Sequence, residues 1–369
     1  MTQARPQAPS SEAPEATVSR GVSAKRLLII VAVLVGALLI TAFTGYLILN
    51  AINGTRHEAT ATASGVTVAP LVTVPGDSAY PIGLARGSDG TLYLSTFGSG
   101  VIYKLAVTGS TGTLTPWVQT MPNTSGNIDG ITAPAALAIA PDGRVIVIDF
   151  NSSKPGTAVG VLKQITPDGQ VRPFGGGASN AQTSSSLSFL SHLAFDNVGN
   201  LYVTFTATSE VWRFTPAGVG APWLKLSTPT NQSTAAQPTG VTFDAADKSM
   251  IVADAASGTI YRVAITSDGQ AGPPLVLYRQ AGLAVQSVTY DAGGHLLLTA
   301  WLHDDGQFAR LEANGTYTLL AQSFREPSDA LLVGTQAYIV NSDLLGLTPL
   351  LHPNPPFTVD VVTLPATSP

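Results

Sequence analysis

A small group of polar side chains could do chemistry in this chain, because they recur at matching places beside short apolar runs. Imidazole, hydroxyl and amide groups can hydrogen-bond a ligand, and carboxylate and amide oxygens are the ligands that hard cations prefer. The candidates at the starts of apolar runs are Ser191, His192, Thr239, Gln286, Ser328 and Asp329. The candidates at the ends of such runs are Asp149, Asp254 and Asn341.

Four of these residues, Asp149, Asp254, Asp329 and Asn341, form an oxygen set that could hold a metal ion. A plainer role is open for Asp149 and Asp254, because short carboxylates at strand ends commonly accept hydrogen bonds from backbone amides of turns. Which role applies depends on the elements that position these side chains.

The candidate residues belong to a repeat, which is clearest at 238–263, PTGVTFDAADKSMIVADAASGTIYRV. A polar turn joins two apolar runs there, and a Ser-Gly turn leads into an alternating run, a pattern typical of three antiparallel strands. Similar segments begin at Pro81, Pro134, Leu190, Val285 and Pro327. The third residue of each copy is its anchor, and the anchors, 42 to 56 residues apart, are Gly83, Ala136, His192, Gly240, Ser287 and Asp329.

Strand-only repeats of this length predict a β-propeller, whose four-stranded blades pack around a central channel. Six copies predict an all-β fold with six blades, and a solenoid is the alternative. The innermost strand of a blade begins at the channel, so residues at or just before each anchor line one mouth, including Ile82 and Ala135. Because His192 and Asp329 fall in the third and sixth repeats, on opposite sides of the ring, we do not expect a direct hydrogen bond between them.

The two ends of the repeat region are expected to close the ring. The sixth copy supplies two strands and, after a Pro-rich loop, a third run at 357–364, which leaves this blade one strand short. The lone β-like run VTVAPLVTV at 66–74 stands before the first copy. We predict that this run completes the sixth blade of a propeller spanning 66–369, because the pairing removes an exposed sheet edge.

The region before the propeller predicts a membrane anchor. Residues 1–26 are rich in Pro, Ala, Ser and Gln, which is typical of a disordered tail. Residues 27–49 carry no charge and would form a helix of about 35 Å, long enough to cross a bilayer. Positive charges gather before this span, so the tail is expected in the cytoplasm, and the propeller outside after a polar linker at 50–65. A cleaved signal peptide is the alternative.

Composition excludes several classes of function. The chain carries 18 Lys and Arg against 23 Asp and Glu, a net charge of −5, so it lacks the basic surface of a nucleic-acid-binding protein. It has no cysteine, which excludes disulfides, thiolate metal sites and a cysteine nucleophile. The expected partners are therefore the membrane and an unidentified protein, polymer or small-molecule ligand.

The repeat resembles the blades of gluconolactonase and strictosidine-synthase-like propellers and the related NHL repeats. The shared motif is P-x-G, an apolar strand, a D-G turn, a strand ending in V-A-D, and S-G-x-I-Y-R, and it is closest at 238–263 and 81–105. The resemblance implies a six-bladed propeller, and lactonases of this superfamily hold a divalent ion that polarises the lactone carbonyl. It places two of the usual ligands at Thr239 and Gln286, neither of which is charged. No cofactor is evident, and Ca²⁺ would need other ligands.

Two functions stay open. The favoured one is a membrane-anchored, outward-facing propeller that binds a ligand or partner without catalysis, because the channel positions lack evident catalytic groups. The alternative is a metal-dependent lactone or ester hydrolase of the gluconolactonase-like type that uses the oxygen set. Strictosidine-synthase-like chemistry would instead need a channel glutamate, for which Glu326, just before Pro327, is the candidate.

Overall fold

The computed structural model describes residues 58–119, 130–150, 160–176, 190–228, 234–303, 305–347 and 353–365, which all belong to one unit, Thr55–Pro369. The expected tail at 1–26, the expected membrane helix at 27–49 and half of the linker at 50–65 lie outside the described residues. Within the described ranges, no helix has the length and hydrophobicity needed to span a membrane.

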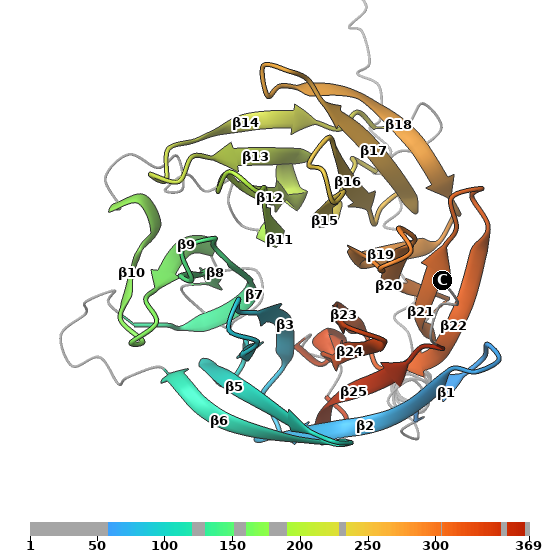
Figure 1. The fold of residues 1–369 in the computed structure, drawn as a ribbon. Coiled ribbons are helices and arrows are strands. Elements are labelled where there is room, and N and C mark those ends of the chain that lie inside the picture. Colours follow the sequence, from blue (N-terminus) through green and yellow to red (C-terminus); the bar gives the residue numbers. More distant parts are fainter. Residues whose placement is uncertain are drawn as a thin grey trace, which may run out of the picture. The chain divides into compact units, whose positions relative to one another are not determined.

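Six antiparallel sheets surround a common axis, which confirms the six-bladed β-propeller (Figure 1). From the axis outward, the strands of blade 1 are β3 (Pro81–Arg86), β4 (Leu92–Thr96), β5 (Val101–Thr108) and β6 (Thr111–Gln119). Those of blade 2 are β7 (Ala133–Ile139), β8 (Val145–Phe150), β9 (Gly160–Ile165) and β10 (Val171–Pro173). Those of blade 3 are β11 (Leu190–Phe195), β12 (Leu201–Phe205), β13 (Glu210–Phe214) and β14 (Gly220–Lys225).

The other three blades repeat this order. Blade 4 contains β15 (Pro238–Phe243), β16 (Ser249–Asp254), β17 (Thr259–Ile265) and β18 (Ala271–Arg279). Blade 5 contains β19 (Leu283–Tyr290), β20 (Leu296–Leu302), β21 (Asp305–Leu311), β22 (Tyr317–Phe324) and, outermost, β1 (Thr60–Ala61). Blade 6 contains β23 (Pro327–Val333), β24 (Gln336–Asn341), β25 (Phe357–Thr363) and β2 (Thr67–Val74). Short 3₁₀ turns occur at Phe174–Gly176, Thr206–Thr208 and Leu344–Leu347.

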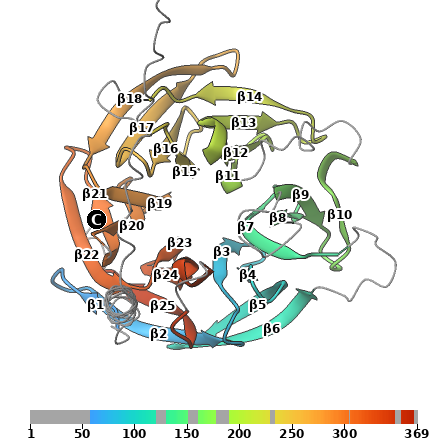
Figure 2. The ribbon, with the colours of Figure 1, turned by 180° about the vertical axis from the view of Figure 1, so that it is seen from behind.

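The ring is closed by the first long strand of the unit. β2 pairs antiparallel with β25 over its whole length, so the outer strand of blade 6 comes from the opposite end of the sequence (Figure 2). The short strand β1 extends the closure to the neighbouring blade, where Thr60 pairs with Gln322 of β22. The segment that joins β1 to β2 therefore crosses the seam between blades 5 and 6.

Each inner hairpin changes register at its channel end. The shift between β3 and β4, for example, falls between Pro81 and Leu84, and the anchor Gly83 lies inside it. Corresponding shifts occur at the same place in the other five blades. Such bulges interrupt the ladder and redirect side chains, so the anchors are the positions where a side chain can turn toward the axis.

Neighbouring inner strands approach closely at the glycine anchors. A Cβ on Gly240 would lie 2.8 Å from Cα of Ser287 in the next blade, which is too close for any side chain. We therefore expect Gly240→Ala to lower the free energy of unfolding by about 1–3 kcal/mol, because backbone must move to relieve the clash. Gly130→Ala is the matched control, since a Cβ there meets nothing within 4 Å. Equal urea midpoints for the two variants would contradict this packing.

Candidate functional site

Two predicted channel residues meet across the propeller axis. His192 lies on β11 and Asp329 on β23, strands that face each other across the ring in Figure 1. His192 Nε2 is 3.3 Å from Asp329 Oδ1, and the two side chains are 16% and 7% exposed. The expectation that these residues do not pair is therefore wrong. Both lie at the register shifts of their inner hairpins, where the strand bulge directs the side chains inward, and the imidazole spans the remaining distance.

Backbone amides hold the Asp329 carboxylate in place. The amide of Leu84 in blade 1 donates to Oδ2 at 2.9 Å, and the amide of Ala330 donates to Oδ1 at 2.8 Å. Asp329 is only 5% exposed, and these two bonds, together with the contact to His192, meet the hydrogen-bonding needs of its buried carboxylate. Asp329 thus links blade 6 to blade 1 and fixes the orientation of the imidazole.

The His192 ring keeps one nitrogen without a hydrogen bond. Because the Asp329 carboxylate can only accept, the facing Nε2 of His192 carries the hydrogen, and a neutral ring then has its lone pair on Nδ1. Nδ1 is buried and has no hydrogen-bond partner among the described residues. The backbone amide of His192 donates to Thr204 Oγ1 at 2.9 Å, which fixes the chain beside the half-buried Ser191. A carboxylate that orients an imidazole with a bare nitrogen is the arrangement of a general base.

The side chains of the other predicted channel residues mainly donate hydrogen bonds to backbone carbonyls. Thr239 and Ser328 each donate to a carbonyl of the next blade, that of Val285 and that of Ile82, at 2.6 Å. Gln286 donates to a carbonyl of its own strand at 3.3 Å. Their side chains border the axis, but two of the three are engaged in holding blades together.

A set of hydroxyls that the sequence analysis missed supports the anchors. Ser95, Thr204 and Thr299 each stand one residue before the second-strand residue that pairs with the first residue of the repeat. Their hydroxyl oxygens accept the anchor amides of blades 1, 3 and 5 at 2.9–3.2 Å. Thr204 also donates to a carbonyl of blade 4, at 2.8 Å. The signal in the sequence is that a hydroxyl recurs at this position in alternate repeats, and that the intervening repeats have Ile148, Ala253 and Val340.

The three candidates at strand ends bind the backbone that enters the inner strand. Asp149 Oδ1 accepts the amides of Thr132 and Ala133 at 2.9 and 2.8 Å. Asp254 Oδ1 accepts the amide of Gln237 at 2.7 Å. The role as acceptors of backbone amides is therefore confirmed for Asp149 and Asp254. Asn341 does the same, because its Oδ1 accepts the amide of Arg325 at 2.9 Å.

The oxygen set is not brought together. Asp149, Asp254 and Asp329 lie in blades 2, 4 and 6, and backbone amides occupy oxygens of each carboxylate. Nowhere in the described ranges do three or more His, Asp or Glu side chains form a group that could hold a metal ion. A hard cation needs several oxygen ligands with compensating charge, so the axial residues do not fit the divalent ion that the resemblance implies.

Asp149 also makes a buried ion pair that the sequence analysis missed. Lys163 Nζ lies 2.8 Å from Asp149 Oδ2, and the two side chains are 5% and 1% exposed. Lys163 donates to the carbonyl of Gly130 as well. Its position on β9 matches that of Tyr103 and Trp212 in blades 1 and 3, which belong to or pack against the main apolar core cluster.

Glu326 lies at the junction of blades 6 and 1. Tyr80, Glu326 and Asp343 all have φ values between +46° and +49°, which is unusual for residues with side chains. Burial, with the nearby charges of Asp343 and Glu326, raises the pKa of Tyr80, so its phenol stays protonated at neutral pH. Arg325 Nη1 lies 2.6 Å from Asp343 Oδ2. Glu326 thus belongs to a charged cluster beside the start of the inner strand of blade 6.

No family model matches the chain, and no curated protein matches its sequence. Solved propellers match its fold. A putative gluconolactonase aligns with a TM-score of 0.56 at 13% identity, over 82% of this chain and 93% of its own. A gluconolactonase from Xanthomonas campestris aligns with a TM-score of 0.57 at 12% identity, over 85% and 99%. A catalytically inactive histidine-to-alanine variant of virginiamycin B lyase from Staphylococcus aureus, solved with quinupristin, aligns at 0.52 with 16% identity, over 81% and 100%.

These alignments confirm the resemblance to gluconolactonase-like propellers at the level of the fold. Identities of 12–16% carry no residue roles from one chain to another.

Proposed function

We propose that the axial site is a metal-independent acid–base centre that opens lactones or related esters. The observation that carries the proposal is the pairing of His192 Nε2 with Asp329 Oδ1, which leaves Nδ1 as a proton acceptor. Support at the level of analogy comes from the fold, which is shared with proteins named as gluconolactonases and with a lyase whose histidine variant is described as inactive.

The proposed reaction needs one base and one water molecule. Nδ1 of His192 takes a proton from water as the water oxygen bonds to the carbonyl carbon. The carbon–oxygen bond of the ring then breaks, and the leaving oxygen receives the proton from the imidazolium, which gives a hydroxy acid. Asp329 stabilises the imidazolium that forms between these steps by accepting the hydrogen bond from Nε2. Because Nδ1 is buried, the groups that cover it must move aside when a substrate enters, while Nε2 keeps its contact with Asp329.

The test is turnover of a panel of lactones and aryl esters by the full-length chain in the presence of a chelator. We expect His192→Gln to lower kcat/KM at least about 100-fold, the usual contribution of a positioned base, and Asp329→Asn to lower it by a smaller factor. His295→Gln is the matched control, because His295 forms a similar pair with Asp291, at 2.9 Å, on a surface turn. Turnover that is absent, or equal in the His192 and His295 variants, would refute the proposal.

Ligand binding without catalysis is the second candidate. It is favoured by the bonds of Asp329 to blades 6 and 1, because they give the carboxylate a structural reason to be present. Under this candidate, His192 Nδ1 accepts a hydrogen bond from a ligand hydroxyl or amide. A ligand that protects the chain against thermal unfolding but is not turned over would support this function over hydrolysis.

We also propose that the propeller is anchored outside a membrane by the helix expected at 27–49. The support is the uncharged run itself and the basic residues that precede it. Protease added to intact cells should then digest the propeller and spare the N-terminal tail. Full protection of the propeller would contradict the proposed orientation.

A further inference from the structure

One buried hydrogen-bond donor at the channel mouth lacks an acceptor among the described residues. It is Nε1 of Trp301, on β20 of blade 5. An indole nitrogen can only donate, and a buried N–H without an acceptor lowers the stability of the fold. Because buried polar groups are paired in most proteins, an acceptor that comes from outside the chain would remove this cost.

The register of blade 5 places Trp301 at the mouth where the inner strands begin. Thr299 pairs with the anchor Ser287, and Trp301 is two residues farther along β20. A strand rises about 3.3 Å per residue, so Trp301 lies about 7 Å nearer the mouth, along the strand, than the anchors. His192 and Asp329 are two of these anchors. A molecule that enters through this mouth therefore reaches the level of Trp301 before that of the axial pair.

The Trp301 side chain is directed toward blade 6. At the matching position of blade 3, Thr206 donates to the carbonyl of Pro238, the first residue of the next repeat, at 2.9 Å. At the matching position of blade 6, Ser342 donates to the carbonyl of Pro81, again the first residue of the next repeat. Side chains at equivalent places in a strand point to the same face, so the indole faces the start of β23, the strand that carries the aspartate of the axial pair. Unlike the two hydroxyls, the indole N–H stays unpaired.

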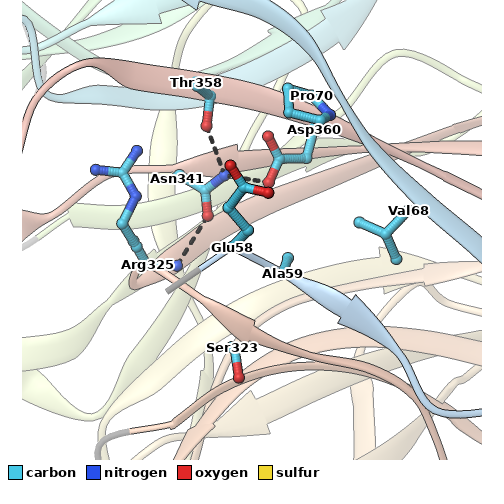
Figure 3. A pocket seen from close by; sticks show the side chains of 9 residues that line it. All are labelled: Glu58, Ala59, Val68, Pro70, Ser323, Arg325, Asn341, Thr358 and Asp360. Carbon is cyan, nitrogen blue, oxygen red and sulfur yellow. Dashed lines mark hydrogen bonds between the residues drawn. The ribbon is translucent and has the colours of Figure 1, made fainter. Parts of the chain in front are cut away.

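The channel mouth thus holds a buried acceptor, His192 Nδ1, and a buried donor, Trp301 Nε1, each without a partner among the described residues. The cavity of about 60 Å³ between blades 5 and 6 differs in this respect (Figure 3). The Asn341 amide that lines it is already used, because it donates to Thr358 Oγ1 at 3.0 Å and to Asp360 Oδ2 at 2.8 Å. An unpaired acceptor and an unpaired donor at one mouth match a ligand that brings both a proton to give and a carbonyl oxygen.

We propose that Trp301 Nε1 donates a hydrogen bond to the carbonyl oxygen of the substrate at the axial site. This inference rests on the proposed function and adds the group that stabilises the developing charge. The carbonyl oxygen becomes negative when the water oxygen bonds to the carbonyl carbon, and a donor already in place lowers the energy of that state. The charge disappears when the carbon–oxygen bond of the ring breaks.

The two groups stand at levels that one water molecule and one carbonyl can bridge. Each hydrogen bond and the attack of water on carbon take about 3 Å, so the chain from His192 Nδ1 through water and the carbonyl to Trp301 Nε1 spans up to about 10 Å. This span exceeds the offset of about 7 Å between Trp301 and the anchors along the strand.

The first test is lactone turnover by the full-length chain with Trp301→Phe, which keeps an aromatic ring and removes the N–H. We expect kcat to fall about 100-fold, the usual effect of losing one such donor, and KM to change little, because the charge develops only in the transition state. Trp117→Phe is the matched control. It makes the same change on the outer strand of blade 1, where the ring packs on Tyr93 at 4.7 Å, and should leave kcat unchanged. Equal kcat values in the two variants would overturn the role of Trp301 and leave hydrolysis by His192 in place.

The second test uses the unsubstituted chain and needs no turnover. The chain has four tryptophans, so ¹⁵N labelling of the indoles gives four N–H signals, which single Trp-to-Phe variants assign. δ-Valerolactam keeps the carbonyl of a δ-lactone but resists hydrolysis, and it should move the Trp301 N–H proton signal downfield, as a new hydrogen bond does. The signals of Trp212 and Trp223 should stay in place, because their N–H groups already donate to Glu210 at 3.0 Å and to the carbonyl of Gly269 at 2.9 Å.

Tetrahydropyran, a ring of the same size without a carbonyl, is the matched ligand and should leave the Trp301 signal unchanged. No shift with the lactam, or equal shifts with the two ligands, would overturn the proposal. The His192 imidazole signals should respond to the lactam with the same half-saturation, because both groups serve one site, and different half-saturation values would overturn it too. A Trp301 shift without turnover of any lactone would support Trp301 as the carbonyl donor and refute the hydrolysis.

Discussion

Deletion of Thr67–Val74, the strand β2, is expected to prevent the propeller from folding stably. β2 pairs along all of β25 and buries Leu71 and Val74, which are 4% and 1% exposed. Each buried aliphatic side chain contributes about 1.5–3 kcal/mol. With the lost edge pairing, the deletion should cost about 5 kcal/mol or more, which is comparable to the whole stability of many domains. Circular dichroism of the deleted and intact chains during heating measures the effect.

Single substitutions in β2 separate the loss of ring closure from the effect of simply shortening the chain. Leu71→Ala should lower the free energy of unfolding by about 2–5 kcal/mol, because a fully buried side chain leaves a cavity. Thr67→Ala, at an exposed position of the same strand, should change it by less than about 0.5 kcal/mol. A deleted chain that melts at the temperature of the intact one would show that β2 does not close the ring.

Asp149→Ala has the second largest expected effect. The change leaves Lys163 buried without its ion-pair partner and removes the acceptor of the amides of Thr132 and Ala133. Breaking a buried pair by removal of one partner costs about 3–5 kcal/mol. Urea unfolding monitored by tryptophan fluorescence should therefore show a large drop in the midpoint.

Two further variants show whether the buried ion pair causes the loss of stability in Asp149→Ala. Asp142→Ala breaks an exposed pair with Arg144 in the same blade and should cost no more than about 1 kcal/mol. In the double variant Asp149→Asn and Lys163→Met, the side-chain oxygen at position 149 can still accept the amides of Thr132 and Ala133, and both buried charges are gone. This variant should therefore recover much of the stability lost in Asp149→Ala. If Asp149→Ala and Asp142→Ala unfold at the same urea concentration, the buried pair contributes nothing beyond a surface contact.

The repeat made most of the fold predictable. Turns such as that at Gly90 and Gly143, where φ is +85°, punctuate apolar runs clearly enough to count blades from sequence. Counting the strands of each repeat likewise showed that the sixth repeat lacks one strand and that the lone β-like run at 66–74 can supply it. Strand β1 could not, because two residues carry no periodic signal and pair only through the geometry of the closed ring.

The candidate site was less predictable, because side-chain direction depends on local irregularity. His192 and Asp329 were placed at the axis by counting, but their contact depends on register shifts that a regular strand pattern does not contain. Asp149 and Asp254 stand at equivalent positions, and both accept hydrogen bonds from backbone amides. A carboxylate at a strand end is compatible with this role, but the sequence alone does not require it. Lys163 was missed because a lysine in a strand is normally exposed.

The ¹⁵N NMR spectrum of the His192 imidazole, assigned with His192→Gln and recorded at a pH where the ring is neutral, tests the pairing of His192 with Asp329. We expect a single tautomer with the hydrogen on Nε2 and a bare Nδ1, and loss of that preference in Asp329→Asn. A lactone or ester substrate analogue should move the Nδ1 signal, because that nitrogen receives the proton. A hydrogen on Nδ1, or a spectrum that Asp329→Asn leaves unchanged, would contradict the pairing on which the proposed chemistry rests.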